Sequence, residues 1–187
     1  ASYCNGEFVY RPSLADGRYK EGIASQTGNL AHRADSPRLH SRDGEPAAVV
    51  FKHFSPYVIC GDPADDANPM TGPATGGVVA EGTAVGDVRV EFSANEGQAW
   101  TEAATVRGDF ALDLTDQLKG RYGWRLRFSW DGTGGLDELT FTTVTQVAQG
   151  IYPRLKPGGT SVAYRAGSRG VVPVPPHFGL PPAEVGT

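Results

Sequence analysis

Residues 122–130 read YGWRLRFSW, a run in which large apolar side chains alternate with polar ones. The even positions hold Trp124, Leu126, Phe128 and Trp130, and the odd positions hold Arg125, Arg127 and Ser129. Successive side chains of a β-strand point to opposite faces of its sheet, so this period of two predicts a strand with one aromatic face and one basic, polar face. We expect the aromatic face, with Trp124 and Trp130, to lie in the core.

Short runs with strand character recur along the rest of the chain, separated by turn residues. They cover residues 8–10, 47–54, 57–60, 78–80, 87–93, 99–106, 110–114, 136–147 and 160–166. The chain has 25 Gly and 14 Pro among 187 residues, which favours many short strands joined by turns. One helical turn is expected at residues 115–120, where Thr115 can cap the start and Gly120 the end. The pattern predicts an all-β fold, an antiparallel β-sandwich of the jelly-roll or Ig-like kind.

The chain divides into three predicted parts. Residues 1–45 have one short apolar run and no regular period, which predicts an irregular N-terminal arm with one strand. Residues 46–170 form the predicted sandwich. Residues 171–187 begin VVPVPPHFGLPP, which predicts a Pro-rich tail or linker in the polyproline II conformation. Such a tail can pack on its own domain or dock on another chain, and the sequence leaves both open.

The charge and hydropathy of the chain limit its partners. The formal net charge is −4, so nothing points to a nucleic-acid-binding surface. No apolar run approaches the roughly 20 residues that a membrane-spanning helix needs. No basic-then-apolar leader opens the chain, so we expect a signal peptide to be absent or already removed. We therefore expect no nucleic-acid partner and no membrane span.

Cys4 and Cys60 are the only cysteines. Without a local His partner they do not suit a structural zinc site. A Cys4–Cys60 disulfide would close a loop of about 55 residues and stabilise the chain by roughly 4 kcal/mol. Two buried thiols are the alternative. The disulfide interpretation implies an oxidising compartment and thus a secreted, extracellular or cell-surface location.

Residue patterns typical of catalysis do not occur in the sequence. No Ser lies in a Gly-x-Ser-x-Gly elbow, and the four histidines, at positions 32, 40, 53 and 177, show no metal-binding spacing. Most acidic residues fall in predicted turns, where Asp ordinarily bonds its own backbone. We expect no enzyme activity and no organic cofactor.

The loop at residues 62–68 is a candidate calcium site. It holds four oxygen-bearing side chains, those of Asp62, Asp65, Asp66 and Asn68. Calcium accepts six to eight oxygen ligands in a flexible geometry, which such a loop can supply. The spacing is not that of an EF-hand, and an acidic surface loop without metal is the alternative.

Aromatic side chains outside the core can stack on a sugar ring while neighbouring polar groups bind its hydroxyls. The candidates for such a surface are Tyr122, Tyr152 and Tyr164, with Arg125 and Arg127 beside them. For the two arginines, simple solvent exposure or pairing with nearby acids is the alternative. A glycan is the ligand that this set of residues favours.

Residues 93–100 read SANEGQAW and lie between two predicted strands. The spacing of Ser93, Asn95, Gly97 and Trp100 resembles the Asp-box hairpin of sialidases and related secreted β-proteins, with Asn95 where Asp is commoner. The resemblance implies a tight turn closed by Asn95, a positive φ at Gly97, and Trp100 packed beneath. It does not extend to the catalytic residues of sialidases, because Tyr122, Arg125 and Arg127 share one strand instead of converging from several blades.

A larger region, residues 87–164, resembles non-catalytic β-sandwich regions of large secreted bacterial hydrolases and cell-surface proteins. The residues that carry this likeness are 93–100, 113–115, 120–123 and 153–158. The resemblance implies an accessory role.

We therefore expect a non-enzymatic extracellular β-sandwich module, an accessory or carbohydrate-binding part of a secreted or cell-surface protein. Its partner would be a glycan or a neighbouring protein domain. One alternative is a structural subunit of an extracellular assembly or filament that docks through its terminal arms. Another is an accessory domain of a sialidase-like glycoside hydrolase.

Overall fold

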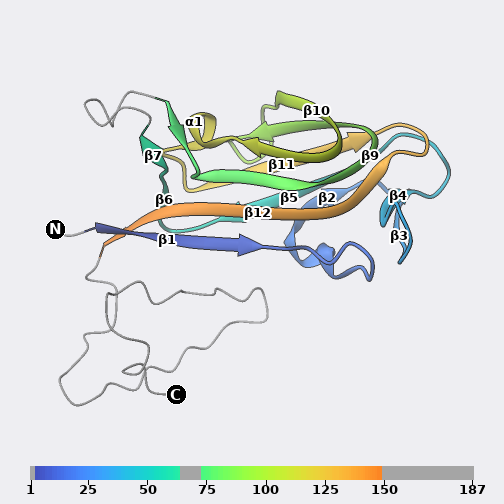
Figure 1. Ribbon diagram of the computed structural model, residues 1–187, viewed down its shortest axis with the longest axis horizontal. Helices are drawn as coiled ribbons and strands as arrows, with labels where there is room; N and C mark the ends of the chain where they lie inside the picture. The colour runs from blue at the N-terminus through green and yellow to red at the C-terminus, as the bar shows by residue number, and fades with distance from the viewer. Residues whose placement is uncertain (1–2, 64–72, 149–187) are drawn as a thin grey trace, which may run out of the picture.

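The computed structural model describes residues 3–63 and 73–148, which are mainly β-structure (Figure 1). The strands are β1 (Tyr3–Tyr10), β2 (Ile23–Gln26), β3 (Leu30–His32), β4 (Leu39–Ser41), β5 (Ala47–Phe54), β6 (Val58–Ile59), β7 (Asp62–Pro63), β8 (Ala74–Thr75), β9 (Val78–Ser93), β10 (Thr101–Asp113), β11 (Gly123–Trp130) and β12 (Gly135–Ala148). The helical elements are the 3-10 helix η1 (Arg18–Gly22) and the single-turn α1 (Thr115–Leu118). The predicted all-β, antiparallel fold class is confirmed.

Ten of these strands form one antiparallel sheet, while β7 and β8 pair separately. The central strand is β9, which pairs with β10 along one edge. Along its other edge, residues 78–85 pair with β12 and residues 89–93 pair with β11. One half of the sheet is built around β12 and the other around β11, and the long β9–β10 hairpin belongs to both. The sheet is therefore continuous where the sequence predicted separate layers.

The β9–β10 hairpin bends at a matched pair of glycines. Gly86 has a φ of 71° and Gly108 a φ of 68°, values in the left-handed region that glycine adopts at least cost. The register between the two strands shifts between Val106 and Gly108. A bulge of this kind bends a strand and increases its twist, so one hairpin can turn from one half of the sheet into the other.

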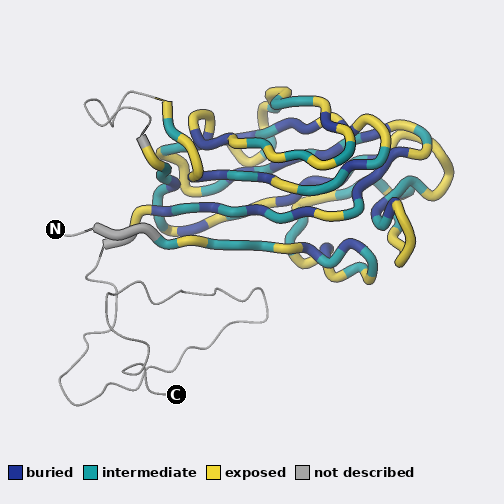
Figure 2. Tube along the Cα trace, in the orientation of Figure 1, coloured by how far each residue is buried: buried dark blue, intermediate teal, exposed yellow. Residues whose placement is uncertain are grey.

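The core lies between the two halves. The ring of Phe141 in β12 is 5.1 Å from that of Phe51 in β5, and 5.2 and 6.1 Å from those of Trp124 and Phe128 in β11. Every even-numbered residue of β11 is buried and every odd-numbered one is half-buried, as its alternation predicted. Figure 2 shows buried and more exposed positions alternating along the strands.

The N-terminal segment differs from the predicted irregular arm. β1 runs antiparallel to β12 over its whole length, and β2 and β4 also pair with strands of the main sheet (Figure 1). Its buried side chains Leu14, Tyr19, Leu30 and Leu39 join the core. They are too widely and irregularly spaced for a local period to reveal them. The strand predicted at 160–166 and the Pro-rich tail at 171–187 lie outside the described residues.

The helical turn α1 is where the sequence placed it, but Thr115 does not cap it. The capping position is Leu114, and Gly120 follows with a φ of 78°. The buried Thr115 hydroxyl instead accepts the amides of Gly77 and Val78 at 2.7 and 2.9 Å. Thr115 thus joins α1 to the start of β9.

No Cys4–Cys60 disulfide is seen in the described part of the structure. Cys4 lies in β1, and Cys60 directly follows β6. These two strands pair with opposite edges of β12, because Thr145 faces one residue of each. Strands two places apart in a sheet are about 10 Å apart, whereas a disulfide needs Cα atoms within about 7 Å. The prediction fails because a strand lies between the two cysteines, and the location inferred from it stays a prediction.

Within residues 3–63 and 73–148, no helix has the length and apolar character that crossing a membrane requires.

Candidate functional site

Polar and aromatic side chains from four strands gather on one sheet face, which we call the outer face. The odd-numbered side chains of β11 point away from the core, and the register aligns them with even-numbered residues of β5 and odd-numbered residues of β9. The outer face consists of Lys52 and Phe54 from β5, Arg125 and Arg127 from β11, Arg89 and Glu91 from β9, Glu102 from β10, and Trp100 from the turn before β10.

The turn between β9 and β10 is closed by two side chains. Ser93 Oγ accepts the amide of Gly97 at 2.8 Å, and Asn95 Oδ1 accepts the amide of Ala99 at 2.9 Å. The Ser93 hydroxyl also donates to Asn95 Oδ1 at 2.9 Å. Gly97 has a φ of 87°. These contacts place Trp100 at the edge of the outer face, and the resemblance to the Asp-box family stays a prediction.

Arg127 joins this turn to the sheet. Its Nε and Nη2 donate to the two carboxylate oxygens of Glu91 at 2.6 and 2.7 Å, a two-pronged geometry that matches the planar guanidinium to the carboxylate. The guanidinium also lies over the half-buried Trp100 ring, 4.3 Å from its centroid. Hydrogen bonds from Arg127 hold the pKa of Glu91 below its ordinary value. Glu91 is therefore held in its charged form, and Arg127 of the same chain binds both of its oxygens.

The remaining acid of the outer face is also paired. Arg89 Nη2 lies 2.9 Å from Glu102 and 3.6 Å from Glu91. Both acids of the outer face are therefore paired with arginines: Glu91 with Arg127, and Glu102 with Arg89.

The other two cations of the outer face have no such partner among residues 3–63 and 73–148. Lys52 and Arg125 lie directly opposite each other in the register of β5 and β11. In the described part of the chain, neither side chain has a hydrogen-bond or ion-pair partner. Arg125 lies against the turn, because its Nη1 is only 3.0 Å from where a Cβ on Gly97 would be. Two like charges thus face each other, and no acid of the described ranges neutralises them.

An exposed aromatic ring lies beside these cations. Phe54 is 77% exposed, and Tyr122 at 55% is the other large hydrophobic side chain that is exposed in the described part of the chain. Gly123 is opposite Phe54 and has no side chain to cover it. Tyr122 precedes β11 at the same end of the sheet, where its carbonyl accepts the Ser55 amide at 2.8 Å. Tyr122 itself lies outside β11, which begins at Gly123.

The structure brings some of the predicted ligand-binding residues together and separates others. Arg125 and Arg127 share the outer face with Trp100, whereas Tyr122 lies at the sheet end and Tyr152 and Tyr164 lie outside the described residues. Sequence reasoning missed Lys52 and Phe54. The alternation of β5 could have indicated them, because both lie an odd number of residues from the core residue Phe51 and therefore point to the opposite face of the sheet.

Most of the predicted calcium loop lies outside the described residues. Asp62 is an exposed residue of β7, while Asp65, Asp66 and Asn68 lie outside the described residues. Within the described ranges, no group of three or more His, Cys, Asp or Glu side chains is placed to hold a metal ion. The calcium site stays a prediction.

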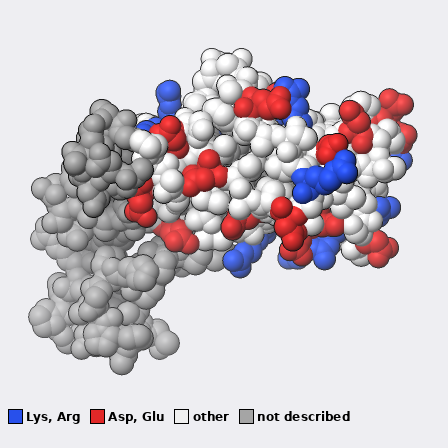
Figure 3. All heavy atoms as spheres, turned by 45° about the horizontal axis from the view of Figure 1, so that its top comes forward, with Lys and Arg blue, Asp and Glu red and all other residues white. Residues whose placement is uncertain are grey.

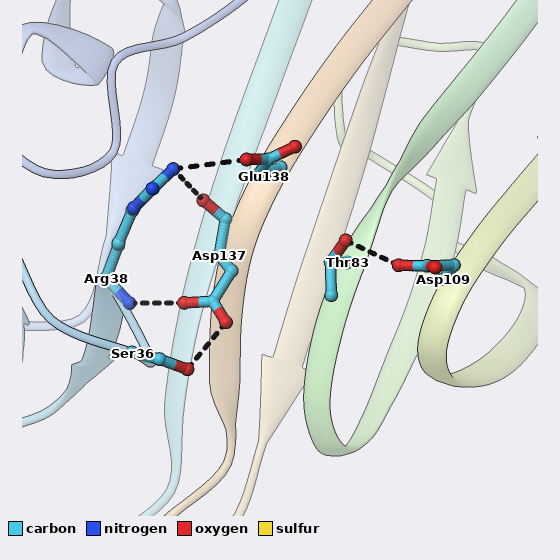
Figure 4. A network of polar contacts seen from close by, with 6 residues as sticks. All are labelled: Ser36, Arg38, Thr83, Asp109, Asp137 and Glu138. Carbon is cyan, nitrogen blue, oxygen red and sulfur yellow. Dashed lines mark hydrogen bonds and ion pairs between the residues drawn. The ribbon is translucent and has the colours of Figure 1, made fainter.

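Other polar clusters have structural roles. Ser36 Oγ and the Arg38 amide donate to the Asp137 carboxylate at 2.6 and 3.0 Å, and the Arg38 guanidinium lies 3.4 Å from Glu138 (Figure 4). These contacts attach the loop before β4 to β12.

Figure 3 shows acidic and basic side chains interspersed over the face it presents, with broad uncharged areas between them.

No protein-family model matches the chain, and no curated protein matches its sequence.

Proposed function

We propose that this chain is a non-enzymatic, extracellular β-module that binds carbohydrate on its outer face, as an accessory part of a secreted or cell-surface protein. The observation that carries the proposal is the exposed ring of Phe54 beside Lys52 and Arg125. Large apolar side chains are normally buried, and an exposed one beside polar groups is typical of a binding surface.

The chemistry of the outer face suits a sugar. One face of a pyranose ring presents C–H groups that pack on an aromatic ring, while its hydroxyls need hydrogen-bond donors and acceptors. Lys52 and Arg125 supply donors that no residue of the described chain uses. Trp100, held by Arg127, provides a rigid edge to the surface. A sheet face of this kind favours an extended polysaccharide over a small molecule, which would need a concave pocket.

The non-enzymatic part of the proposal comes from the sequence, in which no pattern of nucleophilic or metal catalysis occurs. The extracellular location comes from the resemblance to secreted β-proteins.

The proposal is tested by screening the protein against immobilised neutral and acidic polysaccharides, with Phe54→Ala and Tyr122→Ala as a matched pair. Both variants remove an exposed ring, so neither should unfold the protein. We expect binding that Phe54→Ala weakens at least tenfold and Tyr122→Ala changes less than threefold. An absence of binding to every polysaccharide, or equal loss in both variants, would contradict the proposed surface.

The alternative of a structural subunit depended on two features, the N-terminal arm at residues 1–45 and the Pro-rich tail at residues 171–187, and the first no longer supports it. It depended on terminal arms that reach a neighbouring chain, but residues 3–41 supply strands to the chain's own sheet.

A further inference from the structure

The opposition of Lys52 and Arg125 is an unusual feature of the outer face. Side chains directly opposite each other in an antiparallel pair have Cβ atoms about 5 Å apart, and like charges there destabilise the sheet. The register of β5 and β11 places these two cations in that relationship. In the described part of the chain, neither has an acidic partner within ion-pair distance.

The neighbouring arginine shows what is missing. Arg127 is two residues further along β11 on the same face, and it binds the carboxylate of Glu91 through two hydrogen bonds. The corresponding residue opposite Arg125 on β9 is Ser93, which has no charge. The adjoining turn offers the neutral amide of Asn95, and Glu96 forms no ion pair with Arg125. On its β9 side, Arg125 therefore lacks the carboxylate that Arg127 has there.

We propose that a carboxylate of the ligand fills this position, so that the outer face binds a polysaccharide built of uronic acids. This inference rests on the proposed carbohydrate-binding function and names its substrate class. A sugar ring on Phe54 and its carboxylate between Lys52 and Arg125 fit the spacing, because residues two apart on a strand are about 7 Å apart. The carboxylate relieves the repulsion between the two cations.

A carboxylate suits Arg125 better than a sulfate group would. The guanidinium is planar and presents paired N–H donors, a geometry that a planar carboxylate matches in two-pronged contact. Binding driven only by charge would instead follow the charge density of the polymer and disappear with added salt. The two cases are separable by experiment.

The test compares the affinity of the full chain for polygalacturonate, for the same polymer with its carboxylates methyl-esterified, and for a sulfated polysaccharide of matched charge density. The variants are Arg125→Gln and Lys52→Gln, with Arg107→Gln as the control. Arg107 is also an exposed strand arginine, but it pairs with Asp87 on the β9–β10 hairpin, away from Phe54. Thermal unfolding of each variant is recorded, and Arg125→Gln should unfold at the same temperature or a higher one, because it removes a like-charge pair.

We expect polygalacturonate to bind and methyl esterification to weaken binding at least tenfold. Arg125→Gln should weaken it at least tenfold, Lys52→Gln about fivefold, and Arg107→Gln less than twofold. Equal affinity for the esterified polymer, or tighter binding of the sulfated one, would overturn the assignment of uronic acids but leave carbohydrate binding intact. Failure to bind any polymer would remove the proposed function as well. Self-association in sedimentation that Arg125→Gln abolishes would also overturn the inference, because a second copy would then occupy the face.

Discussion

The guanidinium carbon of Arg127 lies 4.3 Å from the centroid of the Trp100 ring, and the same guanidinium binds both oxygens of Glu91. One side chain thus joins β11, β9 and the turn that leads into β10. We expect this contact to hold the outer face in place.

Arg127→Ala should lower the free energy of unfolding by about 2 kcal/mol, because Glu91 would keep its nearly buried charge with only the more distant Arg89 as a partner. Urea unfolding at neutral pH measures this loss. The control is Arg107→Ala, which breaks the pair with Asp87 between two exposed side chains and should have little effect. Equal losses in both variants would show that Arg127 is an ordinary surface arginine.

Thr115→Val should destabilise the protein by about 2 to 3 kcal/mol. The valine has the same shape but cannot accept the amides of Gly77 and Val78, which would then be buried without partners. The matched control is Thr83→Val, whose hydroxyl donates to Asp109 at an exposed site. Denaturant titration compares the two, and a Thr115 loss as small as that of Thr83 would contradict the role of this hydroxyl.

His53 should make the stability depend on pH. Burial lowers the pKa of His53 to about 4, and its ring is packed between those of Phe8 and Trp124, 5.4 and 5.7 Å away. The unfolded chain takes up a proton near the ordinary pKa of about 6.5, whereas the folded chain resists it until about pH 4. The contribution is therefore complete above pH 6.5 and is lost as the pH falls toward 4, by about 3 kcal/mol at most.

The measurement is the free energy of unfolding at several values between pH 7 and pH 4.5, for the parent protein and for His53→Phe. Acids with lowered pKa, such as Glu91, titrate mainly below this window. We expect the parent protein to lose stability across the window and His53→Phe to lose clearly less. Parallel curves would exclude His53 as the source.

The bend in the β9–β10 hairpin should require glycine at position 108. Gly108→Ala should cost about 1 kcal/mol, because the φ of 68° is unfavourable for a residue with a Cβ although the site itself is open. Gly28 also has open space but no positive φ, so Gly28→Ala should be neutral or slightly stabilising. Thermal unfolding of both variants separates backbone strain from crowding, and an unaffected Gly108→Ala would contradict the account of the bend.

This bend also shows where sequence reasoning stops. The sequence predicts two separate strands at residues 78–80 and 87–93, with Gly82 and Gly86 in the segment between them. In the structure both belong to β9, and long-range pairing with β10 and β12 holds the intervening residues extended. Residues 99–106 and 110–114 likewise merge into β10 around Gly108. Local patterns can identify strand faces, whereas continuity is decided by partners far away in the sequence.

The candidate site was predictable to a similar degree. Alternation alone placed Arg125 and Arg127 on one face, since it needs only one strand. Their different surroundings could not be predicted, because the carboxylate that binds Arg127 comes from Glu91, 36 residues away. The disulfide prediction failed for the same reason, as no local signal shows that β12 lies between β1 and β6.

The most direct test of the central claim is to map the backbone amide shifts of the full chain by NMR during titration with a polygalacturonate oligosaccharide. We predict that the largest shifts fall on Lys52, Phe54, Gly123 and Arg125, with a smaller change at the Trp100 indole. Shifts centred elsewhere on the molecule, or none at saturating oligosaccharide, would contradict the assignment of the outer face as the binding surface.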